Sequence, residues 1–527
     1  MNKINILWAD DEIDLLRPHI LFLKEKGYEV KTAKSGDEAI GMMQAELFDI
    51  VFLDENMPGL SGMETLSRIK NHRADIPVVM ITKHEEEHIM EDAIGSKISD
   101  YLIKPVNPNQ ILLSLKKILA GRQLVSEKTT LNYQQEFRQI GMSLNDTLTA
   151  ETWKDVYKKL VYWELELAKS DDESMSDMLS MQKQEANSSF SKFIEKNYIS
   201  WLHAGNSPIS SGRGVGGEVP LLSHTILKNK LNPLLDRKEN VFLLVIDNLR
   251  YDQWKMIQPK INELFKVDEE LLYYSILPTV TQFARNALFA GLMPSEIEKI
   301  HPDLWKNEED EGGKNQFEPE LMTLQLKRWG KDVKHSYHKI LSLSEGKKLA
   351  DNISNLMQNK LNVIVYNFVD MLSHARTEME VIRELADDEA AYRSLTVSWF
   401  EHSPLHDIIK HIAEKKGLLV ITTDHGSIRV TTPSKVVGDR NTSTNLRYKQ
   451  GKSLSYDKRD VLEVRNPDDV FLPRVNVSTS YIFAKQDKFF AYPNNYNHYA
   501  QYYRNTIQHG GISLEEMLIP FVTLSVK

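Results

Sequence analysis

Cysteine is missing from the 527 residues of this chain. Its absence excludes disulfides, thiolate metal sites and cysteine nucleophiles together, so any bound metal must rely on histidine and carboxylate ligands. A run of roughly 18 apolar residues, the length that a membrane helix needs, is also missing. The N-terminal residues show no basic segment followed by an apolar one, so we expect no export signal, no membrane association and a cytoplasmic location.

The chain also lacks an excess of basic charge. It carries 65 Lys and Arg against 74 Asp and Glu, a formal net charge of -9. Without a general positive field, and without a helix-turn-helix pattern, no direct DNA binding is expected. A local basic pocket stays possible. The length exceeds what one hydrophobic core supports, which indicates two or three domains of α/β type.

Short apolar runs alternate with amphipathic segments from the N-terminus to residue 122. This alternation predicts a doubly wound parallel sheet with helices on both faces. The five strand candidates are INILWAD, YEVKTA, DIVFLD, IPVVMIT and DYLIKP.

Charged side chains stand where several of these strands end. Asp10 and Asp11 follow the first strand, Asp54 ends the third and Lys104 ends the fifth. Ligands collect at the carboxyl ends of parallel strands, and converging carboxylates repel each other unless a hard cation lies among them. Oxygen ligands of this kind favour Mg²⁺, and Thr82 can offer a hydroxyl to a phosphoryl group on Asp54.

The D-D pair, the DENMPG motif, the threonine and the K-P pair resemble a CheY-like receiver domain. This resemblance implies a sheet with the strand order 2-1-3-4-5. It also implies that Asp54 accepts a phosphoryl group, that Asp10, Asp11 and Asp54 bind Mg²⁺, and that Thr82, Tyr101 and Lys104 form the switch.

Residues 123–207 show helical periodicity without strand-like alternation, which predicts a helical bundle that connects two domains. The segment GNSPISSGRGVGGEVP then marks a flexible boundary. Residues 208–527 form a second α/β domain, in which VFLLVIDN, LLYYSILP, LNVIVYNFVD and GLLVITTDHG are candidates for buried parallel strands. Residues 303–318 are expected to be an exposed insertion.

Aspartate and histidine again follow the apolar runs of this second domain. The candidate metal ligands are Asp247, Asp370, His374, Asp424, His425 and His509. Asp370 and His374 are four residues apart and would share one face if the chain turns helical there. Carboxylate and imidazole are the donors that Zn²⁺ takes when thiolates are absent, and six ligands suit two ions better than one.

Thr281 precedes a helical stretch, where free N–H groups and the helix dipole favour a phosphate. A metal beside its hydroxyl would favour ionisation, so Thr281 is the candidate nucleophile. Arg285 and Asn286, about one turn further on, are candidates for contacts to phosphate oxygens. Both can equally be structural.

The order Asp, Thr, D-x-x-x-H, D-H and a late H-G-G resembles the alkaline phosphatase superfamily, in particular its phosphodiesterase and PglZ branches. The resemblance implies an alkaline-phosphatase-like domain with two Zn²⁺ ions. One ion would take Asp247, Thr281, Asp424 and His425, and the other Asp370, His374 and His509. A threonine cannot become formylglycine, so sulfatase activity is disfavoured.

The segment NTSTNLRYKQGK carries Arg447, Lys449 and Lys452. These side chains can bind a second phosphate or a nucleotide backbone. An exposed basic loop is an equally good interpretation.

Receiver, helical middle and PglZ-type domain together resemble the response regulators associated with type IX protein secretion. That resemblance implies a sensor histidine kinase and a sigma factor as partners, and linear or cyclic oligonucleotides as substrates. We also expect a homodimer when Asp54 is phosphorylated. Two alternatives stay open: a metal-containing scaffold that binds its partners without catalysis, and a phosphosugar mutase or phosphotransferase.

Overall fold

The structure is a computed structural model that describes residues 4–73, 76–82, 98–145, 148–169, 173–205, 219–386, 388–439 and 442–527. It divides into two compact units, residues 1–132 and 133–527. The expected three-part division at residues 122 and 207 stays a prediction. Residue 122 lies within helix α5 (Pro108–Asn145), and most of the Gly- and Ser-rich boundary segment lies outside the described residues.

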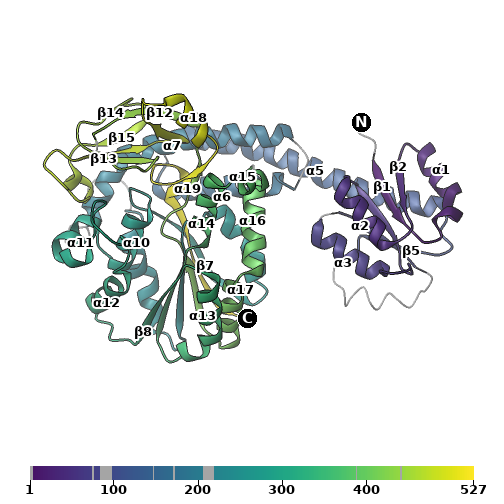
Figure 1. Cartoon of the computed structure of the whole chain (residues 1–527), viewed down its shortest axis with the longest axis horizontal. Helices are drawn as coiled ribbons and strands as arrows, with labels where there is room; N and C mark the ends of the chain where they lie inside the picture. Colours follow the sequence, from purple (N-terminus) through teal and green to yellow (C-terminus); the bar gives the residue numbers. More distant parts are fainter. Residues whose placement is uncertain are drawn as a thin grey trace. The chain divides into compact units, whose positions relative to one another are not determined.

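The N-terminal unit contains a parallel sheet of five strands in the order β2-β1-β3-β4-β5. Strands β1, β2 and β5 are labelled in Figure 1. The strands are β1 (Asn5–Ala9), β2 (Glu29–Ala33), β3 (Ile50–Asp54), β4 (Val78–Thr82) and β5 (Asp100–Ile103). All five coincide with the apolar runs of the sequence, so the predicted doubly wound sheet and its strand order are confirmed.

Two hydrophobic clusters lie on opposite faces of this sheet, because alternate side chains of a strand point to opposite sides. Leu7 and Val51 pack with α2 (Gly36–Ala45) and α3 (Gly62–His72) on one face. Ile6 and Ile50 pack with α1 (Arg17–Glu25) and the start of α5 on the other. The short helix η1 (Ile13–Leu16) precedes α1. The carboxyl ends of the strands therefore form one polar edge.

The predicted helical middle consists of long helices. They are the end of α5, α6 (Ala150–Leu167) and α7 (Glu173–Gly205). Thr149 begins α6 with a capping box, in which its side chain and that of Thr152 each accept a backbone N–H of the other residue. The apolar side chains of α6 and α7 belong to the same hydrophobic cluster as the sheet of the C-terminal region.

The C-terminal region is built on a sheet of six strands in the order β7-β19-β10-β6-β9-β8. The strands are β6 (Val241–Ile246), β7 (Phe265–Tyr274), β8 (His335–Ile340), β9 (Leu361–Tyr366), β10 (Leu418–Thr422) and β19 (Leu518–Val526). Strands β10, β6 and β9 are parallel, as predicted, and β8, which the sequence analysis missed, adds to them in parallel. For the run LLYYSILP the prediction was wrong, because β7 pairs antiparallel with β19 at the edge of the sheet.

The described helices of this region precede or separate its strands in the sequence. They are α8 (Ser223–Ile226), α9 (Tyr251–Ile261), α10 (Thr281–Ala290), α11 (Pro294–Ile300), α12 (Glu318–Arg328), α13 (Leu343–Leu356), α14 (Phe368–Glu378), α15 (Glu380–Leu385), α16 (Glu389–His402), α17 (Pro404–Glu414), α18 (Tyr496–Tyr503) and α19 (Leu514–Met517). Short helical turns are η3 (Leu227–Leu231), η4 (Asn232–Asp236), η5 (Pro302–Leu304) and η6 (Pro467–Val470).

Three small sheets lie between β10 and β19 in the sequence. Their strands are β11 (Ile428–Arg429), β12 (Thr432–Val437), β13 (Tyr448–Gly451), β14 (Ser455–Tyr456), β15 (Val461–Val464), β16 (Ser480–Ala484), β17 (Lys488–Ala491) and β18 (Ile507–Gln508). Among the described helices, none has the length and apolar character that crossing a bilayer demands.

Candidate functional site

The polar edge of the N-terminal unit holds the charged residues that the sequence predicts there. One carboxylate oxygen from each of Asp10, Asp11 and Asp54 lies within 4.8 Å of the others. The Nζ of Lys104 lies 2.7 Å from Asp54 Oδ1 and 3.0 Å from Asp10 Oδ2. Burial and the nearby Asp10 raise the pKa of Asp54, although Lys104 opposes them. Two buried carboxylates beside an exposed third suit a divalent cation, because one lysine does not balance their charge.

Among the predicted switch residues, Lys104 and Thr82 lie at or next to this pocket. The hydroxyl of Thr82 donates a hydrogen bond to Glu55 Oε2 at 2.6 Å, so it engages the residue next to Asp54. Tyr101 is partly buried against the hydrophobic cluster beneath α2 and α3. The switch roles of these residues stay predictions.

Asp247, Asp424 and His425 form the first ligand cluster of the C-terminal region. Asp247 follows β6 and the other two follow β10, and these strands are parallel neighbours, so their ends meet. One ligand atom of each residue lies within 4.8 Å of the others. All three side chains are buried. The parallel pairing of β6 and β10 therefore explains how residues far apart in the sequence converge.

Thr281 lies beside this cluster at the first position of α10. Its Oγ1 lies 3.3 Å from Asp247 Oδ1 and 3.1 Å from His425 Nε2. The Nδ1 of His425 lies 3.1 Å from the carbonyl oxygen of Gly426. A carbonyl only accepts, so Nδ1 carries the proton and Nε2 keeps a lone pair, which can bind a cation or accept the proton of Thr281.

The charges of this cluster suit the binding of a cation. Burial and the neighbouring Asp247 raise the pKa of Asp424 to about 8. Its Oδ2 is buried and has no hydrogen-bond partner among the described residues. Burial would also raise the pKa of Asp247, but the Arg285 guanidinium lowers it. An orphaned carboxylate oxygen beside a second carboxylate and a neutral imidazole is a suitable donor set for Zn²⁺.

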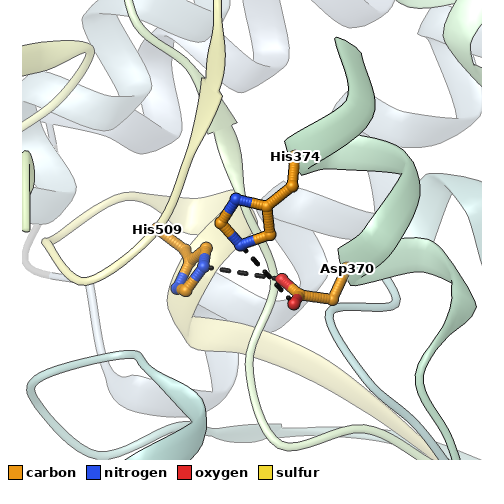
Figure 2. Close-up of side chains that lie close together, drawn as sticks. All are labelled: Asp370, His374 and His509. Carbon is orange, nitrogen blue, oxygen red and sulfur yellow. Dashed lines mark ion pairs between the residues drawn. The ribbon is translucent and has the colours of Figure 1, made fainter. Parts of the chain in front are cut away.

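Asp370, His374 and His509 form the second cluster, shown in Figure 2. Asp370 and His374 project from α14, so the chain does turn helical there and places them on one face. Asp370 Oδ2 lies 3.6 Å from His374 Nε2, and Asp370 Oδ1 lies 3.6 Å from His509 Nε2. His374 is largely exposed, whereas the other two are mostly covered. One side of this cluster therefore faces solvent.

His509 joins the second cluster to the first. Its ring stacks on the ring of His425 with 4.3 Å between centroids. Its Nδ1 lies 3.3 Å from the carbonyl oxygen of Thr279, so Nδ1 carries the proton and Nε2 faces Asp370. Burial and the nearby His425 lower the pKa of His509 to about 4, which keeps the ring neutral at physiological pH. Neutral imidazole is the form that binds metals.

Asn248 also links the two clusters, and sequence reasoning missed it. Its backbone N–H donates to Asp424 Oδ1 at 3.4 Å, and its Nδ2 donates to Asp370 Oδ1 at 3.4 Å and to Ser373 Oγ at 3.3 Å. The residue is fully buried and has a φ of 64°, in the left-handed region. The signal was an asparagine two residues after the end of β6, since asparagine is enriched at positive φ.

Arg285 lies beneath the first cluster and is held by carboxylates on both sides. Its Nη1 lies 2.5 Å from Asp247 Oδ2, and its Nε lies 2.6 Å from Glu318 Oε1. All three side chains are almost completely buried. Arg285 therefore orients the carboxylate of Asp247, and Glu318 is a further supporting residue that the sequence did not reveal.

The segment 303–318 contacts the start of α10 and is not simply an exposed insertion. Asn315 Nδ2 donates to the carbonyl oxygen of Thr281 at 3.0 Å. Asn286 Nδ2 donates to the carbonyl oxygens of Gln282 and Lys314 at 2.8 and 3.1 Å, which uses both of its amide protons. The prediction for this segment is therefore corrected, because its backbone and side chains fix the helix that begins at Thr281.

The basic side chains of the segment 441–452 differ in exposure. Arg447 is fully buried and its Nη2 lies 2.6 Å from Glu516 Oε2. Lys449 is 1% exposed and donates to the carbonyl oxygen of Ser443 at 2.7 Å. Lys452 lines a cavity of about 320 Å³ together with Glu308. The interpretation as an exposed basic loop is thus wrong for Arg447 and Lys449. A phosphate contact by either residue stays a prediction.

Three family models match the chain. A response regulator receiver domain matches residues 6–116, a PorX response regulator linker domain matches residues 123–202, and a BREX system PglZ alkaline phosphatase-like domain matches residues 226–524. The third match covers more than half of the chain and contains all seven candidate residues of the C-terminal site.

Curated relatives resemble the N-terminal part. The alginate biosynthesis regulator AlgB of Pseudomonas syringae pv. tomato is 37% identical over 123 residues, which are 23% of this chain and 28% of that protein. ResD of Bacillus subtilis is 32% identical over 118 residues, which are 22% of this chain and 49% of that protein. The chain thus spans less than two thirds of the length of these relatives.

Solved structures resemble the same part. The chemotaxis regulator CheY4 of Vibrio cholerae is 30% identical, with a TM-score of 0.21, over 22% of this chain and 99% of that one. A receiver domain protein of Methanospirillum hungatei JF-1 is 26% identical, with a TM-score of 0.21, over 23% of this chain and 96% of that one.

The fold, the two sites and the matches define a class of protein, a response regulator whose output domain is an alkaline phosphatase-like domain. The chain belongs to the PglZ alkaline phosphatase-like family. With the receiver and the linker domain in the same order, it has the architecture of PorX.

Proposed function

We propose that this chain is a cytoplasmic response regulator, phosphorylated on Asp54, whose output domain is a two-zinc phosphodiesterase. The observation that carries the proposal is the convergence of six Asp and His side chains in two adjoining clusters beside the hydroxyl of Thr281. The donor set and the buried Asp424 Oδ2, which has no hydrogen-bond partner among the described residues, support zinc. Mg²⁺ suits the oxygen-only cluster around Asp54.

Zinc ions at the two clusters would favour ionisation of the threonine hydroxyl and neutralise charge on the phosphoryl oxygens. The Nε2 of His425 lies at hydrogen-bond distance from Thr281 Oγ1 and can hold its proton. The position of Thr281 at the start of α10 also places an incoming phosphate at the positive end of the helix.

The reaction proceeds by two displacements. Thr281 Oγ1 forms a bond to phosphorus while the ester P–O bond breaks, and the leaving oxygen takes up a proton. Water then attacks the phospho-threonine, the Oγ1–P bond breaks and the hydroxyl is restored. Arg285 keeps the carboxylate of Asp247 in place during both steps, because its guanidinium is fixed by Glu318 on the other side.

Linear or cyclic oligonucleotides are the proposed substrates. The exposed edge of the second cluster at His374 gives a phosphodiester chain access from solvent. The cavity lined by Lys452, Thr442 and Ser443 also contains the carboxylates of Glu308, Glu309 and Asp439, so its hydroxyl and amide groups can contact the sugar or base of a nucleotide rather than its phosphate.

Phosphorylation of Asp54 is proposed to favour a homodimer and to regulate type IX secretion together with a sigma factor. The support is the PorX architecture and the hydrogen bond between Thr82 and Glu55, which must change if Thr82 turns to a phosphoryl group on Asp54. A phosphoryl group adds charge that this buried pocket accommodates only by rearranging.

The test compares wild type with Thr281→Ala and Thr281→Ser in zinc content and in hydrolysis of bis(p-nitrophenyl) phosphate. We expect about two zinc ions per chain in all three proteins, and a loss of roughly 10²-fold or more in kcat for Thr281→Ala only. Undiminished activity of Thr281→Ala would reject the nucleophile. If wild type binds zinc but does not hydrolyse the ester, the metal-containing scaffold is favoured. If a separate assay shows that wild type transfers phosphoryl groups between sugars, the phosphosugar mutase is favoured.

A further inference from the structure

The helical middle makes hydrogen bonds to the loops that carry the candidate ligands. We propose that helices α6 and α7 act as a brace for the zinc site, with Asn187 and Tyr198 of α7 as positioning residues. This inference rests on the proposed two-zinc function. It assigns the segment between receiver and output domain a role in shaping the site, in addition to joining the two domains.

Asn187 holds the first turn of α19. Its Nδ2 donates to Glu515 Oε2 at 3.0 Å, and its Oδ1 accepts the backbone N–H of Leu514 at 2.8 Å. The side chain is 5% exposed, so these bonds form away from water. Both polar groups of one α7 side chain are thus used on α19.

The turn held by Asn187 lies between two histidine loops. The carbonyl oxygen of Glu516 accepts the N–H of Gly426, the residue after His425, at 3.1 Å. A Cβ at Gly426 would lie 2.0 Å from the carbonyl oxygen of Glu515, so the two backbones are in close contact. The carboxylate of Glu516 accepts the N–H of Gly511, two residues after His509, at 2.8 Å. Displacement of α19 would therefore move both histidines.

Tyr198 holds the segment that leads to Thr281. Its hydroxyl accepts the backbone N–H of Leu277 at 2.8 Å, and its side chain is 1% exposed. Two residues further on, Thr279 Oγ1 donates to the carbonyl oxygen of Gly511 and accepts the N–H of Gly510, both at 3.0 Å. Tyr198 therefore fixes a segment that is itself joined to the loop of His509.

A chain of ion pairs connects α6 to the loop of Asp247. Glu164 Oε1 lies 2.7 Å from Arg393 Nη1, which lies 3.2 Å from Asp252 Oδ2. Asp252 also pairs with Arg250, three residues after Asp247, at 2.6 Å. The segments that carry Thr281 and four of the ligands are thus supported by α6 or α7. These ligands are Asp247, Asp424, His425 and His509. Partners outside the ligand set typically change metal affinity about 10- to 100-fold when removed.

The experiment compares two pairs of variants of the full chain. Tyr198→Phe and Asn187→Leu remove the proposed contacts. Tyr133→Phe and Gln182→Leu are matched controls, because these buried side chains bond to each other within the helical middle and Gln182 also bonds to Phe137. The readouts are hydrogen exchange of residues 277–281 and 509–517, zinc affinity by chelator competition, and the visible spectrum of the Co²⁺-substituted protein.

We expect faster exchange in both segments, about tenfold weaker zinc binding and a changed Co²⁺ spectrum for Tyr198→Phe and Asn187→Leu. The controls should lower the unfolding temperature without these changes. Equal effects in all four variants, or unchanged exchange and spectra in the first two, would overturn the brace. If Asn187→Leu fails to fold, Tyr198→Phe alone decides. Hydrogen exchange does not require zinc, so the brace can be judged even if wild type binds none and the proposed function fails.

Discussion

Asp424 combines three unfavourable features in one side chain. It is fully buried, its neighbour Asp247 is also a carboxylate, and its Oδ2 has no hydrogen-bond partner among the described residues. Such a group costs stability in the absence of a cation. Residues placed for chemistry commonly carry a cost of this kind.

Replacing Asp424 by Asn should therefore have opposite effects on two properties: it should maintain or raise the stability of the metal-free protein and weaken the binding of zinc. In chelator, we expect the unfolding temperature of Asp424→Asn to equal or exceed that of wild type, because the cost of burying an ionisable carboxyl group beside Asp247 is removed. With zinc at about 100 times Kd, wild type should gain about 2.7 kcal/mol and the variant clearly less. Calorimetry with and without zinc measures both effects. An equal zinc-dependent gain in the variant would contradict this role of Asp424.

Asn248 offers a second test at this scale, because its side chain links the clusters and its φ is 64°. Asn248→Gly fits that backbone conformation, whereas Asn248→Ala should be about 1 kcal/mol less stable than the glycine variant. Both variants should change the Co²⁺ spectrum, since both lose the amide bond to Asp370. Asn495, with a φ of 55° in the turn before α18, is the matched control for backbone strain. Unaltered spectra in both Asn248 variants would refute the link.

Lys449 should respond to pH. Burial lowers its pKa to about 8, below the value of about 10.4 in an unfolded chain. The folded state then binds fewer protons between these values, so stability from this group rises as pH increases through that window. Relative to Lys449→Met, wild type should gain about 3 kcal/mol between pH 7 and 10.5. Urea unfolding at both pH values measures the difference, and a constant gap would show that the lysine keeps its ordinary pKa.

At the scale of elements, strand ends made much of the site predictable. Every candidate of the first cluster follows an apolar run, and β6 and β10 are parallel neighbours, so their ends coincide. The i, i+4 spacing of Asp370 and His374 placed them on one face on the condition of a helix, and α14 meets that condition. Fold class and ligand convergence could therefore be predicted from local patterns.

Long-range contacts could not be predicted in this way. The antiparallel pairing of β7 with β19 joins residues about 250 positions apart, and no local pattern encodes that direction. Asn187, Glu318 and Arg447 are ordinary polar residues in the sequence, and only tertiary packing shows their partners. The same packing buries Arg447 and Lys449, for which the sequence left an exposed loop and a phosphate contact equally open.

Helix α14 alone supplies two of the three ligands in the second cluster. His374→Ala should lower the zinc content from two ions per chain to about one, since the first cluster lies on other elements. We expect a decrease in kcat of roughly 10²-fold with little loss of stability, because His374 is largely exposed. His402, at the end of α16 and also exposed, is a suitable control position. Two retained zinc ions in His374→Ala would exclude this histidine as a ligand.

At the scale of the whole molecule, the account combines a phosphorylation site and a hydrolytic site in one chain. Acetyl phosphate with Mg²⁺ should phosphorylate wild type but not Asp54→Asn, as seen by retardation in a phosphate-affinity gel. Light scattering should then show a dimer for phosphorylated wild type and a monomer for the variant. A dimer of equal affinity in Asp54→Asn, treated in the same way, would disprove the proposed switch.

The central claim is that two zinc ions lie beside the hydroxyl of Thr281. Anomalous diffraction at the zinc absorption edge, from crystals of the zinc-loaded chain, tests it most directly. We predict two peaks, one among Asp247, Asp424 and His425 and one among Asp370, His374 and His509. A map with no peak at these side chains, or with zinc bound only elsewhere, would contradict the account.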